Sequence, residues 1–458
     1  MAMSPRGLGE KRMGVWGYGR FPNSYSYSAS KIEFFFHNLV WPDCHDDLLR
    51  AFIERKNAKA QRKMYGRDRT STLPYPNTPS LLSFSRRITF LTCGTLRVDD
   101  YPRGGLMDSR ERILTILKGG IPDRVGRMES CWSETINAWK EQGLEEGQDV
   151  NELFKFDFYS LPWPNLTFRF TPVIIEETDE YTLQKDDNGV TRKDMKRESG
   201  HTPHWLNHTL KTSRDWYEYK ERLTPDDSRI SPQIQKHFDN GRKAGKFTHL
   251  AGIEGYECAW PVFGQVGLFM LMMDEPDVVK DVFETYTDLT LGLAQKVLDM
   301  GIDYDGVWFF GDLGYRNGTL FSPECYNELL FPSHCRLCDF FNSKGKPVIL
   351  HSCGKIETLI PKFIEAGFSA IQPLEAKCGQ DVRALKEQFG NKITFFGNID
   401  VRKLSGTKAD VEEEIMSKLP IAMKGGGYIF HSDHSVPPTV SFENYKYAIE
   451  LIDKYGNY

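Results

Sequence analysis

Residues 347–375 read PVILHSCGKIETLIPKFIEAGFSAIQPLE, and this stretch decides which fold the sequence predicts. Its two apolar runs, 347–353 and 368–375, have the length of buried strands, and the run 356–366 between them has the spacing of an amphipathic helix. A strand, a helix and a second strand in this order are typical of a parallel sheet covered by helices. Further helical runs follow at 381–389, 409–424 and 442–455.

Outward from this stretch, the chain contains eight candidate strands. They lie at 124–130, 154–161, 247–255, 305–312, 347–353, 368–375, 393–400 and 427–434. Eight parallel strands that alternate with helices form a (β/α)8 TIM barrel, so the sequence predicts an α/β protein with this fold. A run rich in Thr, Val, Ile and Tyr at 166–192 interrupts the alternation, and its Asp187-Asn188-Gly189 is typical of a type I′ hairpin turn. We expect this run to form an antiparallel excursion from the barrel.

The first 106 residues differ from the remainder in charge and in pattern. They contain 17 Lys and Arg against 9 Asp and Glu, a net charge of about +8, and their apolar patches have no lasting periodicity. This pattern is typical of a poorly ordered extension, and a basic docking arm is the alternative. Regular structure is expected from Met107, with Asp108 and Ser109 capping a first helix that ends at Gly119. We therefore predict an irregular basic extension over 1–106 and a barrel over 107–458.

Composition and charge exclude several classes of protein. The net charge of −5 over 458 residues lacks the concentrated basic surface that nucleic-acid binding needs. The nine cysteines show no disulfide-framework spacing, no apolar run is long enough to cross a bilayer, and the N-terminus has no secretory signal pattern. We expect a cytoplasmic protein that binds neither nucleic acid nor membranes, and a homodimer is compatible with this composition.

Seven of the eight predicted strands end in polar residues. In a TIM barrel the carboxyl ends of the strands form the active-site face. The alternative interpretation is that a polar residue simply marks the point where a strand leaves the core. This explains a single polar residue well, but it explains ten of them on seven strands poorly. The ten are Glu129, Glu254, Asp312, His351, Cys353, Glu375, Asn398, Asp400, Asp433 and His434.

The sharpest of these signals is His351-x-Cys353, followed by Gly354. Side chains two residues apart on a strand point the same way, and imidazole with thiolate suits Zn²⁺ better than hard cations. His434 can supply a third ligand across the mouth of the barrel, and Glu375 a fourth or exchangeable one. The alternative interpretation is a buried thiol beside a hydrogen-bonded histidine.

Several nearby residues have two interpretations each. Cys378 is either a reserve ligand or a loop residue. Asp433 either orients a ligand histidine from behind or is a solvated carboxylate. The pair Asn398 and Asp400 either hydrogen-bonds a substrate or caps the next helix, and the second role is favoured.

Three stretches of the sequence resemble the uroporphyrinogen decarboxylase superfamily. They are HSCG at 351–354, GNID at 397–400 and the final stretch 427–444. The resemblance covers most of 108–458, is strongest from residue 305 onward and excludes the first hundred residues. It implies the same barrel fold.

One branch of this superfamily comprises zinc-dependent methyltransferases that move a methyl group between a corrinoid protein and a thiol. The chain is similar to them in its His-x-Cys-Gly element, and the resemblance implies His351 and Cys353 as zinc ligands. The family's third ligand is usually a cysteine, and His434 occupies its place here, which leaves the identity of the methyl acceptor open.

The resemblance also implies partners and supporting residues. Zn²⁺ would be bound, and the corrinoid would come from a partner protein because the chain has no corrinoid-binding motif. The methyl acceptor would be a small molecule. Glu375 would lie near the metal, and Asp312 and Asn398 would orient the acceptor or the corrinoid edge. Tyr256 is a candidate lid or stacking residue, with packing at the rim as its alternative.

The decarboxylases of the superfamily differ in the loop after the first strand, which is rich in arginine and gathers the substrate's carboxylates. Here residues 129–134 read ESCWSE, without arginine. A polycarboxylate beside Glu129, Asp312 and Glu375 is electrostatically unfavourable. We therefore expect a methyltransferase, with uroporphyrinogen decarboxylase as the first alternative and a non-catalytic tetrapyrrole-binding barrel as the second.

Overall fold

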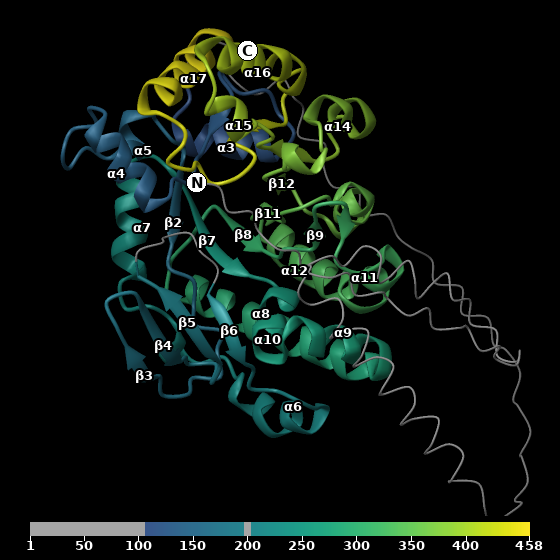
Figure 1. The fold of residues 1–458 in the computed structure, drawn as a ribbon. Helices are drawn as coiled ribbons and strands as arrows, with labels where there is room; N and C mark the ends of the chain where they lie inside the picture. Colours follow the sequence, from purple (N-terminus) through teal and green to yellow (C-terminus); the bar gives the residue numbers. More distant parts are fainter. Residues whose placement is uncertain (1–105, 197–202) are drawn as a thin grey trace, which may run out of the picture. The chain divides into compact units, whose positions relative to one another are not determined.

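The computed structural model describes residues 106–196 and 203–458, so the extension predicted over 1–106 lies outside the described residues apart from its last one. Eight strands of the described chain form one sheet (Figure 1). Each lies inside one of the eight predicted runs. They are β1 Gly126–Arg127, β2 Phe158–Leu161, β7 Phe247–Ile253, β8 Gly306–Phe310, β11 Val348–His351, β12 Ala370–Gln372, β13 Thr394–Phe396 and β14 Tyr428–Phe430.

The sheet is parallel and nearly closed. Its strands pair in the order β1-β14-β13-β12-β11-β8-β7-β2, and every pair is parallel. At the seam between β1 and β2, the backbone N–H of Asp157 donates to the carbonyl of Arg127 at 2.8 Å. The predicted (β/α)8 barrel is thereby confirmed.

Helices follow the strands and lie around the sheet in Figure 1. The helical runs expected in the second half are all present. They are the 3-10 turn η4 Glu357–Leu359 with α13 Ile360–Ala366, then α14 Val382–Phe389, α16 Lys408–Ala422 and α17 Phe442–Tyr455.

The remaining elements are shorter connections or lie in the first half of the barrel. The helices are α3 Ser109–Leu117, α4 Ser133–Glu141, α5 Val150–Leu153, α6 Ser213–Tyr219, α7 Ile234–Lys243, α8 Gly255–Phe263, α9 Gln265–Asp274, α10 Pro276–Asp299, α11 Pro323–Leu329, α12 Phe331–Ser343 and α15 Val401–Leu404. The 3-10 turns are η2 Lys220–Arg222, η3 Asp227–Arg229 and η5 Ala376–Cys378, and a short hairpin joins β9 Gly314–Tyr315 to β10 Gly318–Thr319.

The antiparallel excursion is present and longer than predicted. It consists of β3 Val173–Glu177, β4 Tyr181–Lys185, β5 Thr191–Met195 and β6 His204–Asn207, paired in that order. The turn between β4 and β5 contains Asn188-Gly189, but it is not the type I′ turn that we predicted. That turn needs positive φ at both central residues, and here Gly189 has φ 75° while Asn188 is not among the residues with positive φ.

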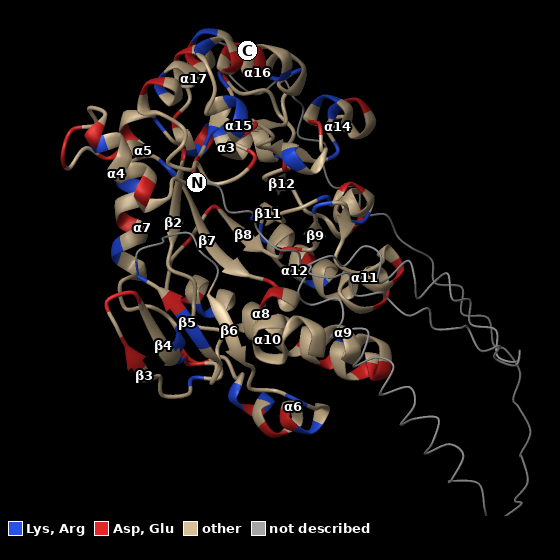
Figure 2. Ribbon diagram, viewed as in Figure 1, with Lys and Arg blue, Asp and Glu red and all other residues tan. Residues whose placement is uncertain are grey.

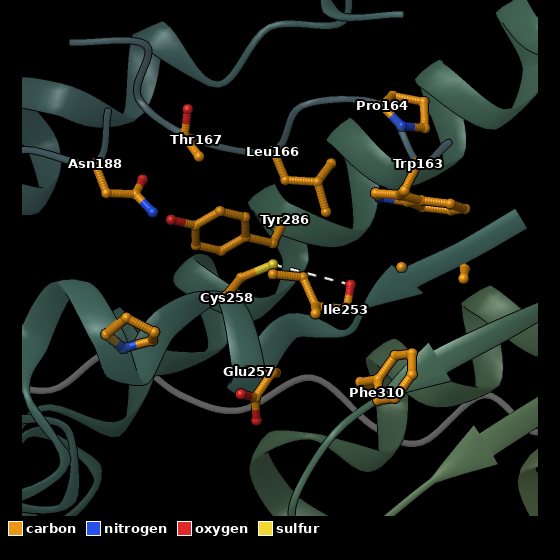
Figure 3. A pocket seen from close by; sticks show the side chains of 13 residues that line it. Trp163, Pro164, Leu166, Thr167, Asn188, Ile253, Glu257, Cys258, Tyr286 and Phe310 are labelled. Carbon is orange, nitrogen blue, oxygen red and sulfur yellow. Dashed lines mark hydrogen bonds between the residues drawn. The ribbon is translucent and has the colours of Figure 1, made fainter. Parts of the chain in front are cut away.

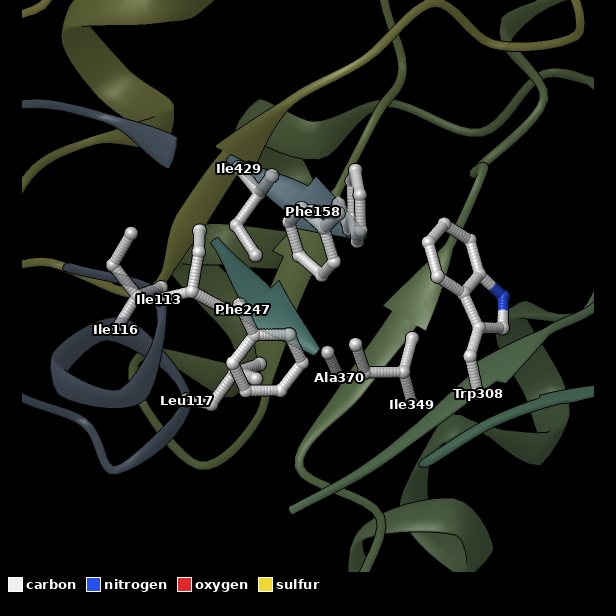
Figure 4. Packing of buried hydrophobic residues seen from close by; sticks show 10 residues of the cluster. Ile113, Ile116, Leu117, Phe158, Phe247, Trp308, Ile349, Ala370 and Ile429 are labelled. Atoms are coloured by element: carbon white, nitrogen blue, oxygen red, sulfur yellow. The ribbon is translucent and has the colours of Figure 1, made fainter. Parts of the chain in front are cut away.

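Helix α3 closes the amino end of the barrel. The Asp108 side chain caps it by accepting from the N–H of Glu111 at 2.7 Å, as predicted. Its Ile113, Ile116 and Leu117 are buried against residues of the strands, which Figure 4 shows from close by. A methyl group at Gly126 would lie 2.5 Å from the side chain of Ile113. Glycine at this position therefore lets the first strand pack closely against α3.

Charged residues of both signs are interspersed on the outer helices, for example on α14, α16 and α17, whereas β7 and β8 carry none (Figure 2). Within residues 106–196 and 203–458, no helix combines the length and the apolar character needed to span a membrane.

Candidate metal centre

A cavity of about 290 Å³ lies at the carboxyl ends of the barrel strands. Its lining includes His351 and Cys353 after β11, Asp312 after β8 and His434 after β14. β8 and β11 are neighbours in the sheet, and β14 lies across the barrel from β8, so residues far apart in the sequence meet at one end of the barrel.

Cys353 belongs to two groups of side chains that can hold a metal ion. The donor atoms of Cys353, His351 and Asp312 lie within 4.8 Å of one another, and so do those of Cys353, Glu375 and His434. The three predicted ligands are thus divided between two groups that share the thiol.

The first group is built on the end of β11. His351 Nε2 lies 3.4 Å from Cys353 Sγ and 3.4 Å from Asp312 Oδ1. Asp312 also accepts a hydrogen bond from the backbone N–H of Cys353 at 2.9 Å, which fixes the loop that carries the thiol. Burial lowers the pKa of His351, but the hydrogen bond and the charge of Asp312 outweigh burial and raise this pKa above its usual value.

The second group is built on the loop after β12. Glu375 Oε2 accepts from Cys378 Sγ at 3.0 Å, and Glu375 Oε1 lies 3.1 Å from Lys377 Nζ. Burial and the neighbouring Lys377 lower the pKa of His434. His434 therefore favours the neutral form, which is the form of imidazole that binds metal ions.

The surroundings of Cys353 fit a divalent cation. Burial raises the pKa of this thiol well above its usual value, and the charges of Asp312 and Glu375 raise it further. A cation among these donors would reverse the effect, because a coordinated thiol loses its proton. Thiolate, imidazole and carboxylate are the donors that Zn²⁺ binds in proteins, so the residues present fit this ion.

Gln372 is a residue of the site that the sequence interpretation missed. It ends β12 and pairs in register with His351, and its Oε1 accepts a hydrogen bond from His351 Nδ1. Because Nδ1 is held by Gln372, Nε2 is the ring nitrogen that faces Cys353 and Asp312. The amide nitrogen of Gln372 lies 3.3 Å from Nε2 of His431, and that Nε2 lies 3.2 Å from Glu129. Aligning the ends of the strands at 347–353 and 368–375 would have placed Gln372 beside His351.

The structure does not bring Asn398 to the cavity. Asn398 is fully buried, its amide N–H groups donate to the carbonyls of Leu374 and Gln380, and its Oδ1 accepts from the N–H of Val382 at 2.9 Å. Its side chain thus fastens loops instead of facing a substrate. Asp400, in contrast, accepts from the N–H of Arg402 as the cap of α15, which is the favoured role for this pair.

One interpretation of Asp433 was a solvated carboxylate, and the structure shows that this is wrong. Asp433 is fully buried, and its carboxylate accepts from the backbone N–H groups of Ala376 and Val401, each at 3.0 Å. It therefore ties together the loops after β12 and β13. Cys378 lies in the 3-10 turn η5 and contacts Glu375, outside both groups of potential metal ligands.

Tyr256 is packed into the rim and does not line the cavity. It is 1% exposed in α8, and its ring lies against Phe321 with 5.3 Å between the ring centroids. Tyr256 therefore packs at the rim, as the alternative interpretation had it, and does not act as a lid or stacking residue in this structure.

Two glycines let the loop that carries the thiol approach the β9–β10 hairpin. A methyl group at Gly354 would lie 2.3 Å from the backbone of Gly314, and one at Gly314 would lie 2.4 Å from the carbonyl oxygen of Cys353. The N–H of Lys355 donates to the carbonyl of Tyr315 at 2.8 Å. The two loops are therefore in direct backbone contact beside Cys353.

A comparison of folds supports the barrel. A methyltransferase from Methanosarcina mazei has a similar structure, with a TM-score of 0.55 and 15% sequence identity, over 76% of this chain and 99% of that one. At this identity the similarity concerns the fold alone.

Curated relatives fall into two groups. The chain is 24% identical over 187 residues to a uroporphyrinogen decarboxylase from Pelobacter propionicus, which is 40% of this chain and 51% of that protein. It is 23% identical over 181 residues to the methylcobamide:CoM methyltransferase MtaA from Methanosarcina barkeri, which is 39% of this chain and 50% of that protein. The chain thus spans about half the length of the curated relatives that it matches.

A family profile matches the second half of the chain. Residues 263–455, which contain both groups of potential metal ligands, match the family described as Uroporphyrinogen decarboxylase (URO-D). The resemblance inferred from HSCG, GNID and the final stretch is therefore confirmed, and this part of the chain carries the sequence pattern of the uroporphyrinogen decarboxylase family.

Proposed function

We propose that the protein is a zinc-dependent methyltransferase that moves a methyl group between a corrinoid carried by a partner protein and a thiol or similar small acceptor. The observation that carries the proposal is the position of Cys353 within 4.8 Å of two sets of nitrogen and oxygen donors at the mouth of the barrel. The MtaA relative from Methanosarcina barkeri is named for this class of reaction.

In this proposal Cys353, His351 and Asp312 bind the zinc ion, because their donor atoms lie within 4.8 Å of one another. His434 and Glu375 form the second group around the same thiol, so His434 joins the predicted ligand set only if its ring moves toward His351. When bound, the ion lowers the pKa of an acceptor thiol and holds it as thiolate. Gln372 orients His351, and Asp312 fixes the backbone of Cys353. The S–CH3 bond forms as the Co–CH3 bond breaks, the electron pair stays on cobalt, and the thiol proton is released to solvent.

The cavity also bears on the main alternative, uroporphyrinogen decarboxylase. Among the described residues that line it, none is Lys or Arg, while Asp312 is acidic. Burying a substrate with several carboxylates here would leave those charges without a cationic partner. The names of the matching family and of the Pelobacter relative favour this alternative.

The test is a methyl-transfer assay with the full-length, zinc-loaded chain. We expect methylcobalamin to lose its methyl group only when a thiol from a panel is added, which absorbance spectroscopy follows. A Cys353→Ala variant should lose the activity, and Cys335→Ala, which changes a thiol on α12 outside both donor groups, should keep it.

Two results would replace the proposal. Conversion of uroporphyrinogen to coproporphyrinogen without thiol-dependent methyl transfer would identify a decarboxylase. Saturable binding of a tetrapyrrole with neither reaction would identify a non-catalytic binding protein.

A further inference from the structure

A second cavity, of about 260 Å³, adjoins the cavity of the candidate metal centre. Figure 3 shows the residues that line it. Its walls come from the loop after β2 and from β7, α8 and α10. Ala251 and Phe310 line both cavities, so a ligand in one lies beside the other. Phe310 in turn packs on His351, with 4.7 Å between the ring centroids.

The lining of this second cavity is mostly apolar. In Figure 3 Leu166 lies between Trp163 and Tyr286, and Phe310 lies on the opposite side. Glu257 is the one carboxyl among the described lining residues, and burial raises its pKa to about 7. None of these lining residues is Lys or Arg, so an anionic ligand would be buried without a cationic partner. The volume exceeds the roughly 150 Å³ that suffices to hold a benzene ring.

Two buried hydrogen-bond donors of the lining have no partner among the described residues. They are the indole N–H of Trp163 and the hydroxyl of Tyr286. Buried donors are nearly always paired, because an unpaired one forfeits its hydrogen bonds to water. A ligand atom that accepts hydrogen bonds would satisfy either group.

The wall that carries Trp163 is held in place by the rest of the fold. The indole lies against Gly252 of β7, where a methyl group would come within 2.4 Å of the ring, so only glycine leaves room for it. The loop that follows Trp163 is fastened by buried Arg229, which donates to the carbonyls of Asn165 at 2.9 Å and Thr167 at 3.0 Å. The cavity is therefore a feature of the fold and not a gap beside a loose side chain.

We propose that this cavity is a binding site for a neutral, ring-sized apolar ligand that carries a hydrogen-bond-accepting oxygen or nitrogen. The ring lies among Trp163, Leu166 and Tyr286, and the accepting atom bonds to the hydroxyl of Tyr286 or to the indole N–H of Trp163. The site does not depend on the proposed function, since binding of this kind needs no metal.

The test compares three probes by ligand-observed NMR titration of the full-length chain. Acetophenone has an accepting carbonyl, α-methylstyrene has the same shape without it, and benzoate is anionic. One hydrogen bond corresponds to a preference of about three- to tenfold, so we expect acetophenone to bind this much more tightly than α-methylstyrene. Benzoate should bind more weakly than either.

Matched variants locate the effect. Tyr286→Phe and Trp163→Phe each remove one donor, and we expect the preference for acetophenone to fall to about one in at least one of them and in the double variant. Tyr304→Phe is the control, because Tyr304 is also buried with an unpartnered hydroxyl but lines neither cavity. It should keep the preference.

Repeating the titration after treatment with a chelator separates this proposal from the proposed function. Acetophenone binding that persists without metal supports the site even if methyl transfer fails. Two results would overturn it: ring probes that show no saturable binding, or a preference for acetophenone that survives in the double variant.

Discussion

At the amino end of the barrel the buried carboxylates of Asp157 and Asp305 face arginines, whereas at the carboxyl end Asp312 and Glu375 surround a thiol. Asp157 is fully buried and accepts from Arg112 and Arg124, each at 2.9 Å. At the other end Lys377 is the cation that pairs with Glu375. The amino end balances its charges within the chain, while the carboxyl end has donors suited to an added cation. If the proposed function is correct, stability and binding depend on opposite ends of the same strands.

The largest expected effect concerns the carboxyl end. Cys353→Ala removes the donor common to both ligand groups, so we expect the zinc content to fall from about one ion per chain to near zero. Elemental analysis after dialysis measures this content. Cys335→Ala should retain the zinc, and a Cys353→Ala protein that still held one ion per chain would show that the thiol is not a ligand.

The next largest effect concerns the amino end. Asp157→Ala leaves Arg112 and Arg124 without their shared buried partner, and we expect the free energy of unfolding to fall by about 3–5 kcal/mol in a urea titration. The zinc content of the folded protein should not change. Asp277→Ala, at an exposed carboxylate of α10, should shift stability by less than about 0.5 kcal/mol. Loss of zinc from folded Asp157→Ala protein would contradict the division between the ends.

Gln372 tests whether orientation of a ligand matters apart from its presence. Gln372→Leu removes the acceptor for His351 Nδ1, and we expect the affinity for zinc to fall by about 10- to 100-fold in a competition titration with a chelator. Gln372→Glu keeps an acceptor oxygen and should restore most of that affinity. Equal affinities in the two variants would mean that His351 is not held by this bond.

The smallest expected effect is at the cap of α3. Asp108→Ala removes the acceptor for the N–H of Glu111, and we expect a loss of about 1 kcal/mol in the free energy of unfolding. Asp108→Asn retains an acceptor and should lose only a few tenths of this amount. A change in zinc affinity in either variant would show that the two ends are coupled.

The sequence was most informative where strands are buried on both faces. Runs such as 347–353 and 393–400 stand out because such strands need continuous apolar residues, and each contains an observed strand. The excursion was only partly predicted, because β6 lies beyond the predicted run and its two apolar residues, Trp205 and Leu206, are too few to indicate a strand. The turn at Asn188-Gly189 has the residues of a type I′ hairpin, but a five-residue connection between Lys185 and Thr191 selects another geometry.

The site was predicted less completely than the fold. The ends of β8, β11 and β14 brought Asp312, His351, Cys353 and His434 to one cavity, as expected from strand ends in a barrel. Asn398 is also a polar residue at a predicted strand end, yet its side chain forms hydrogen bonds with backbone groups and does not face the cavity. The local sequence pattern does not specify in which direction a side chain at a strand end points. Gln372 was overlooked because an amide at a strand end has no strong metal-binding signature of its own.

The backbone contact between Gly314 and Gly354 has an evolutionary consequence. Since neither position has room for a side chain, each glycine limits what can replace the other. Related sequences that preserve the sulfur at position 353 in this geometry should keep both glycines together, although the two are forty residues apart in the chain. The presence of both glycines would distinguish homologues that have this contact between the two loops from homologues in which the loops have another conformation.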